Sequence, residues 1–212
     1  LLLVGEMSHS FISNLKAKDI PVVLVDHFIE GSGLDSVVTD NLKGTNEMIK
    51  YLADLGHKQI GFLGSSLEHG SFMERFEGYK AALKKNHLEY NEDYVQTGLL
   101  WNGYGVMEKM FKLPKLPTAV FACNDLMAIR AMTAIHDKGL NVPDDISIAG
   151  FDDIDTGSQI NPPLTTVRVQ KEEMGKVGVR RLIQRIKNRE KRAEKITLAT
   201  ELVVRKSCKA VK

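Results

Sequence analysis

Short runs of apolar and β-branched residues recur along the chain, and helical patterns fill the intervals between them. The strand-like runs cover residues 22–25, 37–39, 60–63, 119–122, 146–149 and 165–167. A parallel sheet is covered by crossover helices on both faces, so its strands are apolar almost throughout. The pattern therefore predicts an α/β fold with parallel strands.

Two of the predicted helices have clear start and stop signals. The first begins at the side chains of Asp40 and Asn41 and ends before Gly56, and the second begins at residues 124–125 and ends before Gly139. Asp and Asn oxygens cap helix N-termini, and glycine takes the left-handed conformation that follows a helix end. Further helices are expected over residues 10–18, 73–85, 104–111 and 172–189.

The composition is that of an ordinary globular protein. With 212 residues, of which 43% are hydrophobic, the chain can form one large domain or two lobes of about 100 residues each. Its longest apolar run, near Leu1, is far shorter than the roughly 20 residues that span a bilayer. Cys123 and Cys208 are too few for a disulfide framework, which indicates a reducing compartment and inert thiols. The chain opens on Leu1 inside a strand-like run, so we expect an upstream portion to be missing.

Basic residues gather towards the C-terminus. Between Arg168 and Lys195 there are eleven Lys and Arg against four Glu, within a formal net charge of +2. Such a stretch can bind nucleic acid. However, apolar residues recur there at helical spacing, namely Met174, Val179, Leu182, Ile183 and Ile186. We therefore favour a solvated amphipathic helix over a nucleic-acid patch.

The sequence signatures of catalytic and metal sites are missing. Residues 64–70 lack the lysine of a phosphate-binding loop, and residues 31–33 lack the third glycine of a dinucleotide-binding loop. No Gly-x-Ser-x-Gly motif occurs, and the six histidines show no metal-ligand spacing. The adjacent Asp152 and Asp153 project in different directions, which suits an acid/base pair poorly. We therefore expect no enzyme, no metal site and no cofactor.

Polar side chains follow several predicted strands, at the points where those strands end. In open α/β sheets, ligands bind outside the carboxyl ends of the strands. Together with Arg75, these side chains suit a polyhydroxylated or otherwise polar small molecule. They are Asp26, His27, His69, Ser71, Asn124 and Asp152.

Each of these residues also has a simpler interpretation. Asn124 can serve only as a helix cap, Arg75 only as a partner in a surface ion pair, and Trp101 only as part of the core. The run from Asp152 to Asp153 can be a solvated polar loop after a strand. The residue types alone leave these alternatives open.

Five runs together resemble the lactose- and galactose-repressor family of bacterial transcription regulators. They occur in the order and spacing of that family, and the similarity extends from about Leu1 to Cys208. An ordered set is far more specific than any one motif. The runs are residues 20–26 (IPVVLVD), 55–64 (LGHKQIGFLG), 124–125 (ND), 142–153 (VPDDISIAGFDD) and 162–167 (PPLTTV).

The resemblance implies two Rossmann-like lobes of the type I periplasmic-binding-protein kind, joined by three crossing segments. One lobe would contain residues 1–64 and 168–196, and the other residues 65–167 and 197–212. The first lobe would be incomplete. The family's DNA-binding helix-turn-helix and first strand-helix units have no counterpart in this sequence.

The resemblance also implies a ligand site. Arg75 and Asp152 match the family most specifically, because the neighbouring residues 78–79 and 150–151 match as well. Asp153 is expected to support the loop. Trp101 would provide the family's stacking aromatic ring, with Leu100 as the alternative at that position. The full implied set is Asp26, His27, His69, Ser71, Arg75, Trp101, Asn124 and Asp152.

The implied function is a cytoplasmic, homodimeric ligand-sensing core. It would bind a small molecule, such as a sugar or sugar derivative, between the lobes and so control DNA binding by an N-terminal head. The alternative is a periplasmic-type sugar-binding protein of a transporter. Residues 55–57 and 162–167 follow the regulator pattern and favour the first hypothesis. We expect no membrane association of this chain itself.

Overall fold

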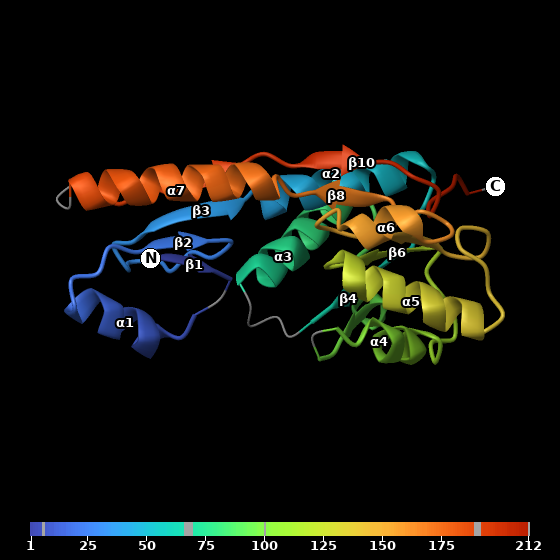
Figure 1. Cartoon of the computed structure of the whole chain (residues 1–212). Helices are drawn as coiled ribbons and strands as arrows, with labels where there is room; N and C mark the ends of the chain where they lie inside the picture. The colour runs from blue at the N-terminus through green and yellow to red at the C-terminus, as the bar shows by residue number, and fades with distance from the viewer. Residues whose placement is uncertain (6, 66–69, 100, 189–191, 212) are drawn as a thin grey trace. The chain divides into compact units, whose positions relative to one another are not determined.

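The computed structural model describes residues 1–5, 7–65, 70–99, 101–188 and 192–211. The chain forms two compact units (Figure 1). The first contains Leu1–Asp40 and Gln170–Ala199, and the second contains Asn41–Val169 and Thr200–Lys212. The chain therefore passes between the units after Asp40, after Val169 and after Ala199.

A four-stranded parallel sheet forms the first unit. Its strands lie in the order β1-β2-β3-β9, and they are β1 (Leu2–Val4), β2 (Val23–Val25), β3 (Asp35–Thr39) and β9 (Lys195–Leu198). Two helices, α1 (His9–Ala17) and α7 (Lys171–Lys187), cover it.

Alternation of side chains along the strands assigns each helix to one face of this sheet. Leu24 packs with Ile12 of α1, whereas Val25 and Leu2 lie against Gly178 of α7. The two helices accordingly lie on opposite faces in Figure 1. The sheet is thus covered on both sides, as the apolar strand pattern predicts.

Helix α7 is present as predicted, but most of its apolar stripe is not buried. Met174 and Arg181 are buried, whereas Val179 and Ile183 are 45% and 47% exposed. The cause is Asp35, which is completely buried and accepts a hydrogen bond from Nε of Arg181 at 2.7 Å. A buried carboxylate without a partner costs free energy, and this cost exceeds the gain from burying the apolar stripe of α7.

A second four-stranded parallel sheet forms the centre of the second unit. Its order is β5-β4-β6-β7, with β5 (Val95–Thr97), β4 (Ile60–Gly64), β6 (Ala119–Ala122) and β7 (Ser147–Ala149). Phe62 and Phe121 from this sheet and Tyr79 from a covering helix form its aromatic core. Burial of these strands on both faces explains their continuous apolar runs.

Paired helices and a short ribbon complete the second unit. Helix α2 (Asn41–Asp54) packs on α3 (Gly70–Lys85), and α4 (Gly103–Met110) packs on α5 (Asp125–Asp137). Strand β8 (Thr166–Arg168) pairs antiparallel with β10 (Glu201–Val203). Short helices cover Glu92–Tyr94 (η1) and Asp155–Gln159 (α6).

Three of the predicted helix signals are confirmed, namely those at Asn124, Gly56 and Gly139. Oδ1 of Asn124 accepts a hydrogen bond from the backbone N–H of Met127 at 2.8 Å and caps α5. Gly56 and Gly139 have φ angles of 90° and 78°, in the left-handed region. By contrast, the apolar pattern does not predict β5 and β9, because both strands are short and incompletely buried.

The division between the units differs from the predicted boundary at residue 64. Residues 41–64 belong to the second unit. Helix α2 packs against α3, and β4 lies inside the second sheet between β5 and β6. These contacts join distant parts of the sequence, so the chain pattern did not reveal them.

Two further findings concern the described part of the chain. No helix there is long and apolar enough to cross a membrane. Among the same residues, no group of three or more His, Cys, Asp or Glu is arranged to hold a metal ion.

Gly103 provides a test of the packing between α4 and α5. A Cβ at this position would lie 2.1 Å from the carbonyl oxygen of Met127, a backbone atom that cannot swing aside. Gly103→Ala should therefore lower the free energy of unfolding by about 1–3 kcal/mol in urea denaturation. Gly70→Ala, where no atom lies within 4 Å, is the control and should change it by less than about 0.5 kcal/mol. Equal losses would contradict the steric explanation.

Candidate ligand-binding site

Several of the predicted ligand residues follow strands that end at the same edge of the second sheet. Strands β4, β6 and β7 are parallel, so their carboxyl ends meet there. Ser71 and Arg75 lie in α3 after β4, Asn124 follows β6, and Asp152 follows β7. The topology therefore brings these four positions to one edge of the sheet.

Arg75 is buried and held from three sides. Its side chain is 3% exposed. Nε donates to Oδ1 of Asn41 at 2.9 Å, and Nη1 donates to the carbonyl oxygen of Cys123 at 2.6 Å. The guanidinium also lies 3.8 Å from the ring centroid of Phe151, a cation–π distance. A planar guanidinium with this many contacts has one orientation, so the surface ion-pair interpretation of Arg75 is wrong.

The fourth contact of Arg75 is with the predicted ligand residue Asp152. Nη2 of Arg75 lies 3.1 Å from Oδ1 of Asp152. Unlike the arginine, the Asp152 side chain is 30% exposed. The pair therefore presents a partly exposed carboxylate whose charge is balanced by a buried, fixed cation. Such a carboxylate can accept hydrogen bonds from the hydroxyl groups of a ligand.

The loop that carries Asp152 has an unusual backbone. Asp152 and Asp153 have φ angles of 112° and 50°, in a region that L-residues rarely adopt. Residues in such conformations concentrate at functional sites, where the surrounding structure holds them. Part of that support comes from β8, because the backbone N–H of Asp152 donates to the carbonyl oxygen of Val167 at 2.8 Å.

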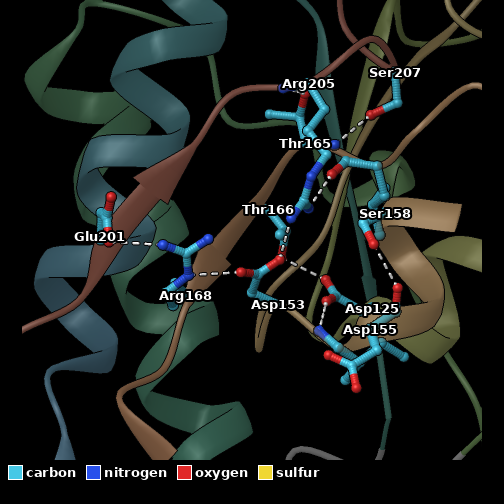
Figure 2. Close-up of polar contacts among 12 residues, drawn as sticks. Asp125, Asp153, Asp155, Ser158, Thr165, Thr166, Arg168, Glu201, Arg205 and Ser207 are labelled. Carbon is cyan, nitrogen blue, oxygen red and sulfur yellow. Dashed lines mark hydrogen bonds and ion pairs between the residues drawn. The ribbon is translucent and has the colours of Figure 1, made fainter.

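Asp153 anchors the loop, as the sequence predicts, and Figure 2 shows its partners. Its carboxylate accepts hydrogen bonds from Nε of Arg168 at 2.7 Å and from Nη2 of Arg205 at 2.6 Å. Burial acts to raise the pKa of Asp153, but the hydrogen bonds and charges of Arg205 and Arg168 outweigh it. The pKa therefore lies below its ordinary value. Arg168 also pairs with Glu201, which ties the loop to both strands of the β8–β10 ribbon.

Asn124 and Trp101 resolve two of the open alternatives. Asn124 is 3% exposed and caps α5, so the cap interpretation is confirmed, and a role towards ligand stays a prediction. Trp101 is 48% exposed with a φ angle of 72°, so it is not a core residue. Ser71, in the first turn of α3, is half-buried.

The other predicted ligand residues belong to the first unit or fall outside the described residues. Asp26 and His27 follow β2 in the first unit, where Asp26 is exposed with a φ angle of 59°. His69 and the alternative stacking residue Leu100 lie outside the described residues. The structure thus brings Arg75 and Asp152 into contact, with Asn124 adjoining Cys123 beside them.

Asn41 and Phe151 have roles in the site that sequence reasoning missed. The sequence predicts Asn41 only as a helix cap, yet its side chain is 3% exposed and contacts two residues of α3. Oδ1 accepts a hydrogen bond from Arg75, and Nδ2 donates to Oε2 of Glu74 at 2.7 Å. Phe151 was noted only as part of a motif. No local sequence signal distinguishes these roles, since they depend on contacts across 34 and 76 positions of the chain.

Both cysteines are buried, as suits the predicted inert thiols. Burial raises the pKa of the Cys123 thiol to about 11 and that of Cys208 to about 12. Neither forms the thiolate that a nucleophile requires at neutral pH.

Two units built on parallel sheets, with a fixed charged pair at the strand ends of the second, define a two-unit α/β protein. The model of the periplasmic binding protein-like domain matches residues 49–208, and the chain belongs to that family. This match confirms the α/β fold that the sequence predicts.

The individual relatives confirm the resemblance to the lactose- and galactose-repressor family of bacterial transcription regulators. The chain is 37% identical over 209 residues to the "Probable HTH-type transcriptional repressor ExuR" of Bacillus subtilis (strain 168), covering 98% of this chain and 63% of that protein. It is 36% identical over 214 residues to the HTH-type transcriptional repressor PurR of Histophilus somni (strain 129Pt), covering 100% of this chain and 64% of that protein. The chain thus spans a little under two thirds of each repressor.

A solved structure shows the same similarity. The crystal structure of a LacI family transcriptional regulator from Enterococcus faecium, with bound ribose, matches with a TM-score of 0.88 and 27% identity. The match covers 97% of this chain and 77% of that one.

Proposed function

We propose that this chain is the ligand-sensing core of a bacterial transcriptional regulator and not an enzyme. It binds a small polar molecule, a sugar or sugar derivative, at Arg75 and Asp152. Asn124, Ser71 and Trp101 contribute from the same unit, as does His69. Asp26 and His27 contribute from the first unit. The observation that carries the proposal is the buried Arg75 holding a partly exposed Asp152.

Several findings support the regulator class over the transport alternative. The relatives reported above are repressors, and the matched structure is a regulator with bound ribose. We propose that ligand binding changes the DNA affinity of a helix-turn-helix head elsewhere in the full-length protein, which acts in the cytoplasm as a homodimer. Full conversion between two states would require about 10⁴-fold preference of the ligand for one of them.

Asp152→Asn tests the site directly. The amide keeps the volume and one acceptor oxygen but loses the charge that strengthens hydrogen bonds to ligand. Since a hydrogen bond to a charged group contributes about 1.5–3 kcal/mol, affinity should fall by about 10–100-fold. Isothermal titration calorimetry of the wild-type chain against pentoses, hexoses and disaccharides first identifies a binding sugar, and the variant is then titrated with it.

Asp54→Asn is the matched control for this experiment. Asp54 forms a surface pair with Lys50, with both side chains well exposed, so its charge should not affect sugar binding. Unchanged affinity in Asp152→Asn would show that the site lies elsewhere. Absence of binding by every sugar in the panel would count against the sugar class itself.

A further inference from the structure

Asp125 is a completely buried acid that lies beside the proposed site. Oδ1 accepts a hydrogen bond from Oγ1 of Thr166 at 2.5 Å, and Oδ2 accepts one from the backbone N–H of Ile154 at 2.8 Å (Figure 2). The backbone N–H of Asp125 donates to the carbonyl oxygen of Phe151 at 2.8 Å. Asp125 thus contacts the loop after β7 on both sides of Asp152.

The loop fits closely around this carboxylate. A Cβ at Gly150 would lie 2.2 Å from Oδ1 of Asp125, so glycine is required for the approach. Between the two points that Asp125 holds, Asp152 and Asp153 adopt positive φ angles. Such a backbone persists only where neighbouring groups fix it. Asp153 fixes one side of the loop through its arginines, and Asp125 fixes both ends.

We propose that Asp125 is a positioning residue for ligand binding, which holds the ends of the loop so that Asp152 is presented beside Arg75. This inference rests on the proposed function, because it assigns Asp125 a role at the same site. Asp125 itself is not expected to touch the ligand, since its carboxylate is fully buried. Thr166 is the partner that extends the restraint to β8.

Both charge states of Asp125 can hold the loop. Burial raises the pKa of Asp125 to about 7, hydrogen bonds from Thr166 and Ile154 lower it, and the charges of Asp152 and Asp153 raise it. A carboxylate accepts from the Thr166 hydroxyl, whereas a carboxylic acid can donate to the same oxygen. Asparagine can do likewise through its amide, so Asp125→Asn is the conservative variant.

The charged groups around Asp125 come from several elements. Three arginines, on α3, on β8 and after β10, balance the charges of Asp152 and Asp153. They are Arg75, Arg168 and Arg205. A further acid, Asp155, is exposed at the start of α6. The Cys123 thiol precedes α5 and is uncharged at neutral pH, because burial raises its pKa.

The raised pKa of Asp125 makes the free energy of unfolding depend on pH. The folded state binds this proton more tightly than the unfolded state, so the stability that the proton contributes is full below about pH 4. It is lost as pH rises through about 7. Asp125→Asn should remove that loss, and urea denaturation at a series of pH values measures it. A purely apolar packing role would give no such difference.

Hydrogen exchange followed by mass spectrometry tests the positioning role without a ligand. Asp125→Ala should raise exchange at residues 151–154 by about 10–100-fold, because the side-chain hydrogen bonds to Ile154 and Thr166 are lost. Asp125→Asn should stay within about threefold of wild type. Should Asp125→Ala prove too unstable, Thr166→Val removes one anchor and should raise exchange at the same residues. Asp155→Ala, at an exposed carboxylate nearby, should not change exchange at residues 151–153.

D-ribose titration provides the functional measurement. Asp125→Ala should weaken its binding at least about tenfold, and Asp125→Asn should preserve it. Unchanged exchange at residues 151–154 in both Asp125→Ala and Thr166→Val would overturn the inference, as would equal losses of affinity in Asp125→Asn and Asp125→Ala. If wild type binds neither ribose nor the other sugars, the proposed function fails, while the exchange result still decides whether Asp125 holds the loop.

Discussion

An Arg75→Met variant is expected to lose about 3–5 kcal/mol of unfolding free energy in the second unit. The substitution removes the donor from Oδ1 of Asn41 and from the carbonyl oxygen of Cys123, and both residues are buried. It also leaves Asp152 without its cation. Methionine fills most of the space over the Phe151 ring, so the loss reflects polar contacts more than a cavity. Urea denaturation monitored by circular dichroism measures it.

Two companion variants sharpen this test. Arg130→Met removes an exposed arginine from α5 and should change the unfolding free energy by less than about 0.5 kcal/mol. Arg75→Lys keeps the charge but not the planar fork that reaches Asn41, Cys123 and Asp152 together. It should retain only part of the stability. If Arg75→Met were no more destabilising than Arg130→Met, Arg75 would not be the buried anchor of the site.

The contacts of Arg75 show which residues of the candidate site can be predicted from the sequence. Asp152 is recognisable because it lies in a run that resembles the family, and Arg75 because the neighbouring residues 78–79 match that family as well. The partners that orient the arginine are not, since Asn41 carries an ordinary capping signal and Phe151 an ordinary apolar one. What makes them partners is the packing of α2 against α3, which joins distant segments. Local chemistry therefore indicates candidate ligand residues more readily than the residues that support them.

Local signals succeed where the physical cause is itself local. The cap of α5 and the left-handed glycines at positions 56 and 139 follow from backbone groups within a few residues. The contact between Asp125 and Thr166 spans 41 positions and depends on how β8 lies beside the loop after β7. No periodicity in the sequence encodes that placement. The same limit explains why the predicted division at residue 64 misplaced α2 and β4.

In helix α7, a distant charged residue explains why the buried residues differ from those that the apolar spacing favours. The spacing favours burial of Val179 and Ile183, yet the helix turns Arg181 inward. Asp35 lies 146 positions away in the sequence and is completely buried, where a carboxylate without hydrogen-bond donors would cost free energy. Two arginines of the basic stretch are thereby committed to the structure of the first unit, since Nε of Arg185 also donates to Asp35 at 2.8 Å.

Asp35→Ala should consequently lower the stability of the first unit by about 3–5 kcal/mol, because it leaves a buried arginine without its counter-charge. The carboxylate accepts from Arg181, Arg185 and the backbone N–H of Glu194, which leads into β9. Hydrogen exchange at β3 and β9 should therefore rise more than exchange at β4, β6 and β7. Asp35→Asn should recover only part of the loss, because the amide is uncharged and turns its NH2 group, a donor, towards one of the two arginines that bond Oδ1 and Oδ2.

Asp54→Ala is the matched control for Asp35→Ala. Its carboxylate pairs with Lys50 at 2.6 Å, but the two side chains are 61% and 58% exposed, and such pairs contribute at most about 1 kcal/mol. The two ion pairs have similar N–O distances, so the comparison isolates the effect of burial on their contribution to stability. Similar losses in both variants would mean that Arg181 and Arg185 are not held by Asp35. The basic stretch would then again be a candidate nucleic-acid surface, and the turned face of α7 would need another cause.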